Sequence, residues 1–139
     1  LLAAAMLCAE GESSIEDVIF ERRFGCAAGF ERLGAKVQVN GRTLCIRPGG
    51  VLRGTELTAP DLRGGAALVV AALAASGTSV IGHPEHIDRG YAAFTEILSS
   101  LGAQIRREER SRNSSAKKTS SKKQNHLAIG TKRWYDTVI

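Results

Sequence analysis

The sequence has few cysteines and no apolar run long enough to span a bilayer, and each shortage excludes a class of protein. The three cysteines are odd in number, lie in apolar stretches and form no C-x-x-C pair, which argues against a disulfide framework or a zinc site. The apolar opening at 1–8 is too short to span a bilayer and lacks the basic segment of a signal peptide. We therefore expect a cytoplasmic protein that does not span a membrane and holds no metal ion or cofactor.

Charge is distributed unevenly along the 139 residues. Residues 106–139 hold ten Lys or Arg and three acids, which gives +7, whereas residues 1–105 hold nine bases and eleven acids, which gives −2. The segment that follows Glu109 is rich in Ser, Thr, Asn, Gln and Lys and has no apolar periodicity. Such composition cannot offset chain entropy by burial. We expect a body at 1–108 and a disordered basic tail at 109–139.

Two parts of the chain repeat the same pattern. AEGESSI at 9–15 matches ASGTSVI at 75–81, and an arginine follows each glycine by twelve positions, from Gly11 to Arg23 and from Gly77 to Arg89. Each copy then reaches Leu-Gly-Ala, at 33–35 and at 101–103. An offset of 66 to 68 residues exceeds the period of a solenoid unit and indicates a duplicated α/β unit.

Local patterns predict alternating helices and strands, hence an α/β fold. Asn40-Gly41 is typical of a type I′ hairpin. Thr58-Ala-Pro-Asp61 is typical of a capping box with proline in the first turn. The predicted helices are 1–10, 25–33, 61–75 and 89–101, and the predicted strands are 13–19, 36–40, 42–46, 55–58, 78–82 and 103–107. The repeat places the start of the first helix before residue 1, so we expect this chain to be a fragment of a longer protein.

Three arginines are expected where a helix begins, namely Arg23, Arg63 and Arg89. Helix N-termini offer free N–H groups, and the guanidinium fork binds carboxylate or phosphate bidentately. Gly64 and Gly65 after Arg63 allow close approach of a ligand or of backbone. Because arginine recurs at equivalent places of the repeat, the pattern favours an anion site.

Plainer interpretations of the same residues stay open. Asp61 and Asp88 are also typical first-turn acids, and they could pair with the neighbouring arginines as surface ion pairs worth about 0–1 kcal/mol each. His83 and His86 flank a proline without a third ligand nearby, which favours loop histidines over metal ligands. Each cysteine is typical of a small core residue.

Four segments together carry a resemblance: FERRF, DLRGGAALVVAALAASG, HIDRGY and LGAQIRRE. In this order and spacing they resemble the C-terminal end of the enolpyruvyl transferase family, over about residues 1–108, and differ from its shikimate-pathway member. The family fold is a pair of inside-out α/β barrels built from repeated βαβαββ units, so the resemblance implies a partial barrel here.

The resemblance also implies a reaction and a site. The enolpyruvyl group of phosphoenolpyruvate would move to the 3′-hydroxyl of UDP-N-acetylglucosamine, with loss of phosphate, in peptidoglycan precursor synthesis. Both substrates are polyanions, which an arginine-lined cleft suits. Arg63 and Arg89 would hold phosphoenolpyruvate and form the catalytic set together with Asp61, and Arg23 and Asp61 would order the cleft. The substrate-binding residues would be Ile19, Phe20, Arg23 and Leu62.

The chain departs from the family pattern in three ways. The family's catalytic cysteine loop and its N-terminal lysine have no counterpart here, and the general-base aspartate would fall before residue 1. Arg22 stands where a smaller polar residue is expected. The tail matches nothing in the family. We therefore expect a chain that is inactive without the missing N-terminal domain, and the alternative is a protein that binds nucleic acid or an anionic surface through the tail.

Overall fold

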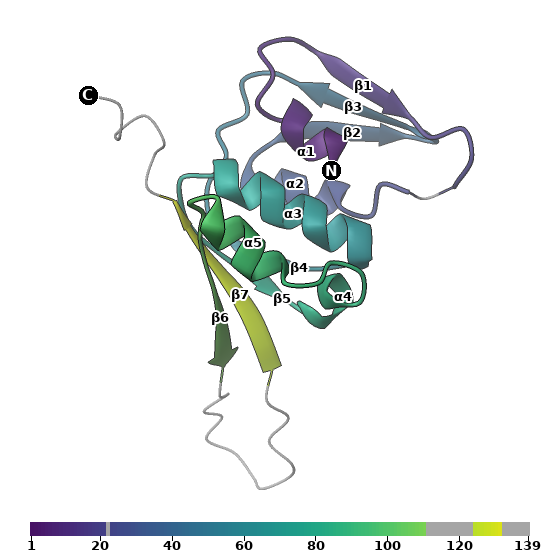
Figure 1. Cartoon of the computed structure of the whole chain (residues 1–139). Coiled ribbons are helices and arrows are strands. Elements are labelled where there is room, and N and C mark those ends of the chain that lie inside the picture. Colours follow the sequence, from purple (N-terminus) through teal and green to yellow (C-terminus); the bar gives the residue numbers. More distant parts are fainter. Residues whose placement is uncertain (22, 111–123, 132–139) are drawn as a thin grey trace, which may run out of the picture.

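The computed structural model describes residues 1–21, 23–110 and 124–131. Two β-sheets lie on either side of a layer of helices (Figure 1). Helices α1, α2 and α3 lie between the sheets, and α5 lies beside α3 over the second sheet. The elements in chain order are α1 Leu2–Met6, β1 Ser13–Glu16, α2 Ala27–Leu33, β2 Lys36–Asn40, β3 Thr43–Arg47, β4 Glu56–Thr58, α3 Leu62–Ala74, β5 Gly77–Gly82, α4 Glu85–Asp88, α5 Phe94–Ser100, β6 Gln104–Arg110 and β7 Gln124–Thr131.

The first sheet has the order β1-β3-β2, and both pairings are antiparallel. The predicted hairpin is confirmed, because Asn40 pairs with Thr43 across a two-residue connection, but the predicted type I′ turn is wrong, since of Gly41 and Arg42 only Gly41 has a positive φ. Gly41 has a φ of 60°, a conformation that glycine adopts without the steric cost of a Cβ atom. The hairpin brings Arg42 close to the end of β1, where it contributes to the turn described below.

The second sheet has the order β4-β5-β7-β6. β4 is parallel to β5, whereas β7 pairs antiparallel with both β5 and β6. The prediction of disorder is therefore wrong for 124–131. Composition hid this strand, because its partner β5 lies far away in sequence and its apolar residues Leu127 and Ile129 are buried only in the assembled sheet. The rest of the tail, at 111–123 and 132–139, lies outside the described residues.

Helix α3 is buried along most of its length because its first eleven residues are mainly small and apolar. It begins after Asp61, whose Oδ1 accepts a hydrogen bond of 2.7 Å from Gly64 N–H. Asp61 is thus the N-cap. The predicted capping box is wrong, since Thr58 lies in β4 instead. The buried residues of α3 are Gly64, Gly65, Ala66, Ala67, Leu68, Val69, Ala71 and Ala72.

One continuous core joins the two sheets through α3. Leu44 of β3 and Phe30 of α2 belong to the same buried cluster as Leu68 of α3, and Ile81 of β5 and Ile129 of β7 complete it from the second sheet. All five side chains are at most 1% exposed. The position of α3 is therefore fixed from both sides, and with it the position of the α3 N-terminus.

Three predicted elements are shorter in the structure by three residues or more at one end. The helix at 1–10 is regular only over Leu2–Met6, and the strand at 13–19 stops at Glu16 because the Asp17 carboxylate bonds the backbone that follows. The helix predicted at 89–101 is wrong at its start. The chain makes the separate turn α4 up to Asp88 and then adopts a left-handed conformation at Ala93, with a φ of 51°, before α5 begins.

Among the described residues there is no helix long and apolar enough to cross a membrane.

Candidate functional site

The first turn of α3 packs directly on α4. A Cβ atom on Gly90 would lie 2.7 Å from Leu62 Cδ2, and one on Gly65 would lie 2.8 Å from Ile87 Cγ1. Glycine is therefore required at Gly65 and favoured at Gly90 for this close approach. Since Arg63 lies between Leu62 and Gly65 in sequence, and Arg89 between Ile87 and Gly90, the contact brings both arginines to one corner of the molecule.

Arg63 and Arg89 are both exposed, and within the described part of the chain neither guanidinium forms an ion pair. The carboxylates that could have paired with them are engaged elsewhere. Asp61 caps α3, and Asp88 is held by Arg107. The ion-pair interpretation of the two arginines is therefore wrong, and both side chains remain available for an anion.

The structure also corrects the environment of Arg89. The prediction placed it at the beginning of a helix, but Arg89 is the C-cap residue of α4. It lies several residues before α5, because Gly90 is packed against Leu62 and the chain turns there. Arg89 would therefore attract an anion through its own charge alone, without a helix dipole. Arg63, in contrast, does lie in the first turn of α3.

The loop between β1 and α2 approaches the same corner. A Cβ atom on Gly25 would lie 3.9 Å from Asp61 Oδ2. Arg23, two residues earlier, stacks on the Phe20 ring with its Cζ atom 4.4 Å from the ring centroid, and its Nε atom lies 3.7 Å from Asp17 Oδ2. Arg23 thus stabilises this loop through its contacts with Phe20 and Asp17.

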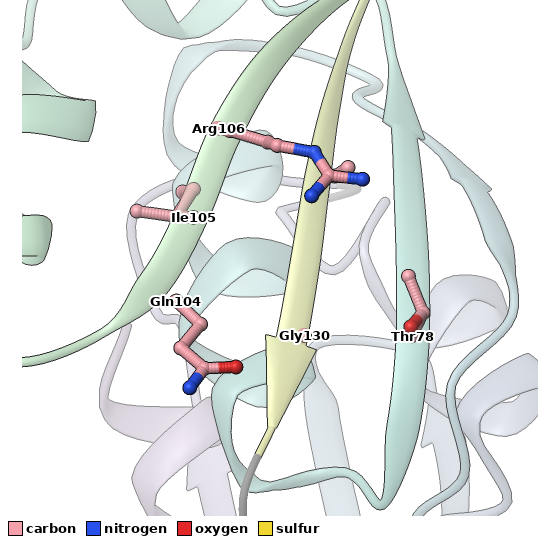
Figure 2. A pocket seen from close by; sticks show the side chains of 6 residues that line it. Thr78, Gln104, Ile105, Arg106 and Gly130 are labelled. Atoms are coloured by element: carbon pink, nitrogen blue, oxygen red, sulfur yellow. The ribbon is translucent and has the colours of Figure 1, made fainter.

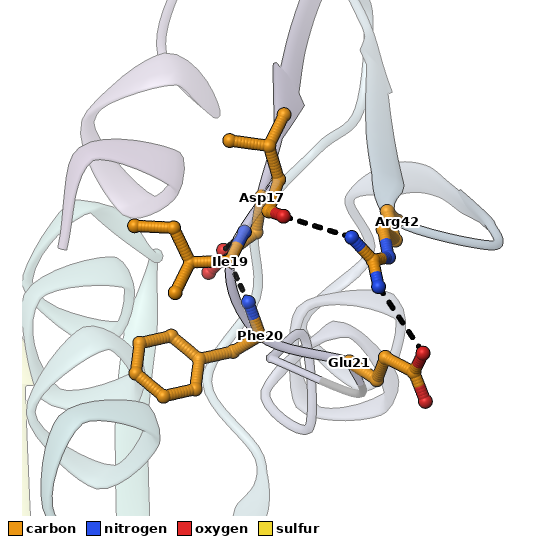
Figure 3. Close-up of polar contacts among 6 residues, drawn as sticks. Asp17, Ile19, Phe20, Glu21 and Arg42 are labelled. Carbon is orange, nitrogen blue, oxygen red and sulfur yellow. Dashed lines mark hydrogen bonds and ion pairs between the residues drawn. The ribbon is translucent and has the colours of Figure 1, made fainter.

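A tight turn carries Ile19 and Phe20, whose side chains lie on the side of the turn away from Arg42 (Figure 3). Asp17 Oδ1 accepts hydrogen bonds from Ile19 N–H at 3.0 Å and from Phe20 N–H at 2.9 Å. These bonds, from Phe20 first and then Ile19, hold the pKa of the Asp17 carboxyl below its ordinary value of 3.8. Ile19 and Phe20 remain 75% and 52% exposed, so the turn displays apolar side chains that the fold itself does not use.

Arg42 fastens the same turn from the neighbouring hairpin. Its Nη1 donates to the Val18 carbonyl oxygen at 2.8 Å, and its Nη2 lies 3.1 Å from Glu21 Oε1 (Figure 3). The turn is therefore held at both ends by side chains, by Asp17 from within and by Arg42 from outside. Such a scaffold lowers the entropy cost of presenting Ile19 and Phe20 to a ligand.

Cysteine and histidine do not form a reactive cluster in the described residues. No group of three or more His, Cys, Asp or Glu there could hold a metal ion. His83 Nδ1 contacts Glu85 Oε1 at 2.9 Å, and His86 Nδ1 lies 3.1 Å from the Ala59 carbonyl oxygen. Burial raises the pKa of the Cys26 thiol, which disfavours the nucleophilic thiolate.

A separate hollow of about 440 Å³ lies against β5, β7 and β6. Figure 2 shows Arg106 reaching across β7, where Ala128 and Gly130 leave room for it. Arg106 also bonds Glu108 at 2.6 Å. One charged side chain over small residues offers no convergent set of polar groups, so we assign no ligand to this hollow. Its lining residues are Thr78, Gln104, Ile105, Arg106, Ala128 and Gly130.

Sequence reasoning missed three residues that order the site, namely Asp17, Arg42 and Arg107. For two of these residues the local sequence held a signal that could have identified them. Asp17 follows a strand and precedes two backbone N–H groups that it can bond as an Asx turn. Arg107 stands two positions after Ile105, so it shares the helix-facing side of β6, where a charge needs a partner. Arg42 carried no local signal, because its partners lie more than twenty residues away.

Comparison with known proteins shows the family to which the chain belongs. Residues 1–98 match the family model described as EPSP synthase (3-phosphoshikimate 1-carboxyvinyltransferase). UDP-N-acetylglucosamine 1-carboxyvinyltransferase 2 of Listeria monocytogenes serotype 4b is 47% identical over 106 residues, which is 76% of this chain and 25% of the relative. The chain thus spans about a quarter of the length of the curated relatives it matches.

Solved structures agree with this assignment. The enolpyruvyl transferase NikO from Streptomyces tendae superposes with a TM-score of 0.70 at 38% identity, covering 76% of this chain and 24% of that one. EPSP synthase from Acinetobacter baumannii, at 16% identity, shares the fold with a TM-score of 0.54 over 94% of this chain and 45% of that one. The chain therefore belongs to the EPSP synthase family of enolpyruvyl transferases.

Proposed function

We propose that the corner formed by Arg63 and Arg89 binds phosphoenolpyruvate within an enolpyruvyl transferase. The observation that carries this proposal is the packing of Leu62 on Gly90 and of Gly65 on Ile87, which brings two unpaired arginines together. Two guanidinium forks suit a small molecule that carries a carboxylate and a phosphate. Leu62, half-buried against Gly90, would form the apolar wall between them.

The acceptor in this proposal is UDP-N-acetylglucosamine, the sugar nucleotide in the name of the Listeria relative. Ile19 and Phe20 would contact it, because they are exposed and presented by a fastened turn. Arg23 would shape the same wall of the cleft by stacking on Phe20. The exposed apolar surface at this turn supports the assignment, since no described element of the chain covers it.

In the proposed reaction the 3′-hydroxyl oxygen bonds to C2 of phosphoenolpyruvate, and the hydroxyl proton is lost while C3 gains a proton. Loss of a proton from C3 then expels phosphate. Arg63 and Arg89 would hold the carboxylate and phosphate through both steps, which is electrostatic stabilisation at fixed positions. Asp61 Oδ1 is occupied by the N–H group of Gly64, so Asp61 orders the cleft in this proposal rather than transferring a proton.

At the level of the fold, we propose that β4, α3, β5, α5, β6 and β7 form one βαβαββ unit of an inside-out barrel. Elements α1 to β3 would belong to a second unit that lacks its first strand. The order β1-β3-β2 in one sheet and β5-β7-β6 in the other supports this, since each unit places its last strand between two earlier ones. The remaining domain would come from further sequence, and the enzyme would act in the cytoplasm on a peptidoglycan precursor.

The alternative of a nucleic-acid-binding tail has less support. Part of the expected tail is strand β7, which is central in a sheet, with Leu127 and Ile129 almost fully buried. The relatives and structural neighbours are enzymes rather than nucleic-acid-binding proteins. The lysines on which such binding would rest, at 117–118 and 122–123, lie outside the described residues.

A segment exchange tests the proposed function. The matching segment of the Listeria relative would be replaced by that of this chain, and phosphate release would be measured with phosphoenolpyruvate and UDP-N-acetylglucosamine. We expect the hybrid to be active and the chain of 139 residues alone to be inactive. A folded but inactive hybrid would contradict the proposal, and so would phosphate release by the chain alone.

A further inference from the structure

Arg107 of β6 grips Asp88 of α4 with both ends of its guanidinium group. Nη1 donates to Asp88 Oδ2 at 2.9 Å, and Nη2 donates to Asp88 Oδ1 at 2.5 Å. This bidentate fork fixes the orientation of the carboxylate as well as its distance. The hydrogen bond to Asp88 also raises the pKa of Arg107. Both side chains are about 40% exposed, so the contact is too solvated to contribute much to global stability.

Within the described residues, this fork is the only side-chain hydrogen bonding between α4 and β6. Arg107 shares a strand face with Ile105, whereas Arg106 points to the opposite face and contacts Glu108 of its own strand. Opposite Arg107 in the sheet stands Leu127 of β7. The fork therefore joins α4 to a strand that lies beyond residues 1–98, the part matched by the family model.

Asp88 is the residue directly before Arg89, so its orientation matters for the site. α4 is a single turn of four residues, so its backbone hydrogen bonds extend no further than this turn and the residues beside it. They include Ile87 N–H to the Pro84 carbonyl at 2.9 Å and Tyr91 N–H to the Ile87 carbonyl at 3.2 Å. So short a helix is not stable by itself and takes its direction from tertiary contacts.

We propose that Arg107 is a positioning residue for Arg89: it anchors the Asp88 carboxylate and so holds the last turn of α4 with Arg89 directed at the corner beside Arg63. This inference rests on the proposed function, because it assigns Arg107 a role in binding phosphoenolpyruvate. It also makes the C-terminal strand pair β6 and β7 a support of the site rather than an appendage.

The test compares Arg107→Met with Arg106→Met in the full chain of 139 residues. The two arginines are neighbours on one strand, and each has one carboxylate partner, but only Arg107 contacts α4. Two quantities are measured, namely hydrogen exchange at the backbone amides of 87–91 by NMR and the dissociation constant for phosphoenolpyruvate. Arg107→Met should accelerate exchange at 87–91 and weaken binding on the order of tenfold, whereas Arg106→Met should change neither.

A double variant separates positioning from general charge. If Arg107 acts through Asp88, then Asp88→Asn with Arg107→Met should bind phosphoenolpyruvate no more weakly than Arg107→Met alone. Unchanged exchange at 87–91 in Arg107→Met overturns the inference, and so does faster exchange with unchanged affinity. If neither the unmodified chain nor the hybrid enzyme binds phosphoenolpyruvate, the proposed function fails, and the exchange data alone then decide whether Arg107 holds α4.

Discussion

Gly65 of α3 lies so close to Ile87 of α4 that a Cβ atom on Gly65 would come within 2.8 Å of Ile87 Cγ1. The same Cβ atom would lie 2.9 Å from the Cβ atom of Ala59, which cannot rotate away. We predict that Gly65→Ala pushes α4 away from α3. Overpacking of this kind costs about 1–3 kcal/mol, partly offset by about 1 kcal/mol of helix propensity. Chemical denaturation and phosphoenolpyruvate binding should both show a loss.

Gly11→Ala is the control for this variant, because a Cβ atom on Gly11 would meet nothing within 4 Å. It should match the unmodified chain in both measurements. If Gly65→Ala is as stable as Gly11→Ala and binds phosphoenolpyruvate equally well, the packing of α4 on α3 does not set the distance between the arginines.

His83 has a φ of 59°, in the left-handed region that L-residues rarely adopt. We predict that His83→Gly is more stable than His83→Ala by about 0.5–1 kcal/mol. Glycine removes the strain at the cost of a more disordered unfolded chain. Both variants lose the contact with Glu85, so their difference in thermal unfolding isolates the backbone effect. Equal melting temperatures would show that the turn before α4 is unstrained.

The C-terminal strand offers a test of the fold. Ile129 is fully buried in the middle of the second sheet, whereas Asn125 of the same strand is exposed. Ile129→Ala should destabilise the chain by about 2–5 kcal/mol, and Asn125→Ala should change its stability by less than about 0.5 kcal/mol. Urea denaturation measures both. Equal midpoints would mean that β7 does not belong to the core.

The turn that presents Phe20 should depend on pH. Hydrogen bonds from the backbone hold the pKa of Asp17 below 3.8, so the folded turn favours the ionised carboxylate. Its contribution is present above the unfolded pKa and is lost as pH falls through the lower folded pKa. The pH titration of the NMR amide signals of Ile19 and Phe20 should therefore have its midpoint below 3.8. Asp17→Asn should abolish that transition, and a transition above pH 4 in the unmodified chain would contradict the assignment.

The sequence predicted the elements whose signals are local. The hairpin at Asn40-Gly41 and helix α3 were confirmed because turn chemistry and a long small-residue run act within a few positions. The prediction failed where distant contacts decide the conformation. Gly90 rests on Leu62 and ends the α4 turn, and β7 is a strand only because β5 and β6 flank it.

The same distinction applies to the site. Arg63 and Arg89 were predicted from their motifs, and the structure brings their backbone positions to one corner. Their supports were not predicted. The partner of Arg107 is 19 residues away in sequence and that of Arg42 is 24 residues away, so no window of local sequence contains either contact.

The most direct test of the central claim is the affinity of the chain for phosphoenolpyruvate in Arg63→Lys, Arg89→Lys and Arg53→Lys. Lysine keeps the charge but loses the bidentate fork. A charge-assisted hydrogen bond contributes about 1.5–3 kcal/mol, so Arg63→Lys and Arg89→Lys should each weaken binding about ten- to a hundredfold with little change in melting temperature. Arg53, exposed and outside the corner, should tolerate lysine. If all three variants bind phosphoenolpyruvate as the unmodified chain does, Arg63 and Arg89 do not form an anion site.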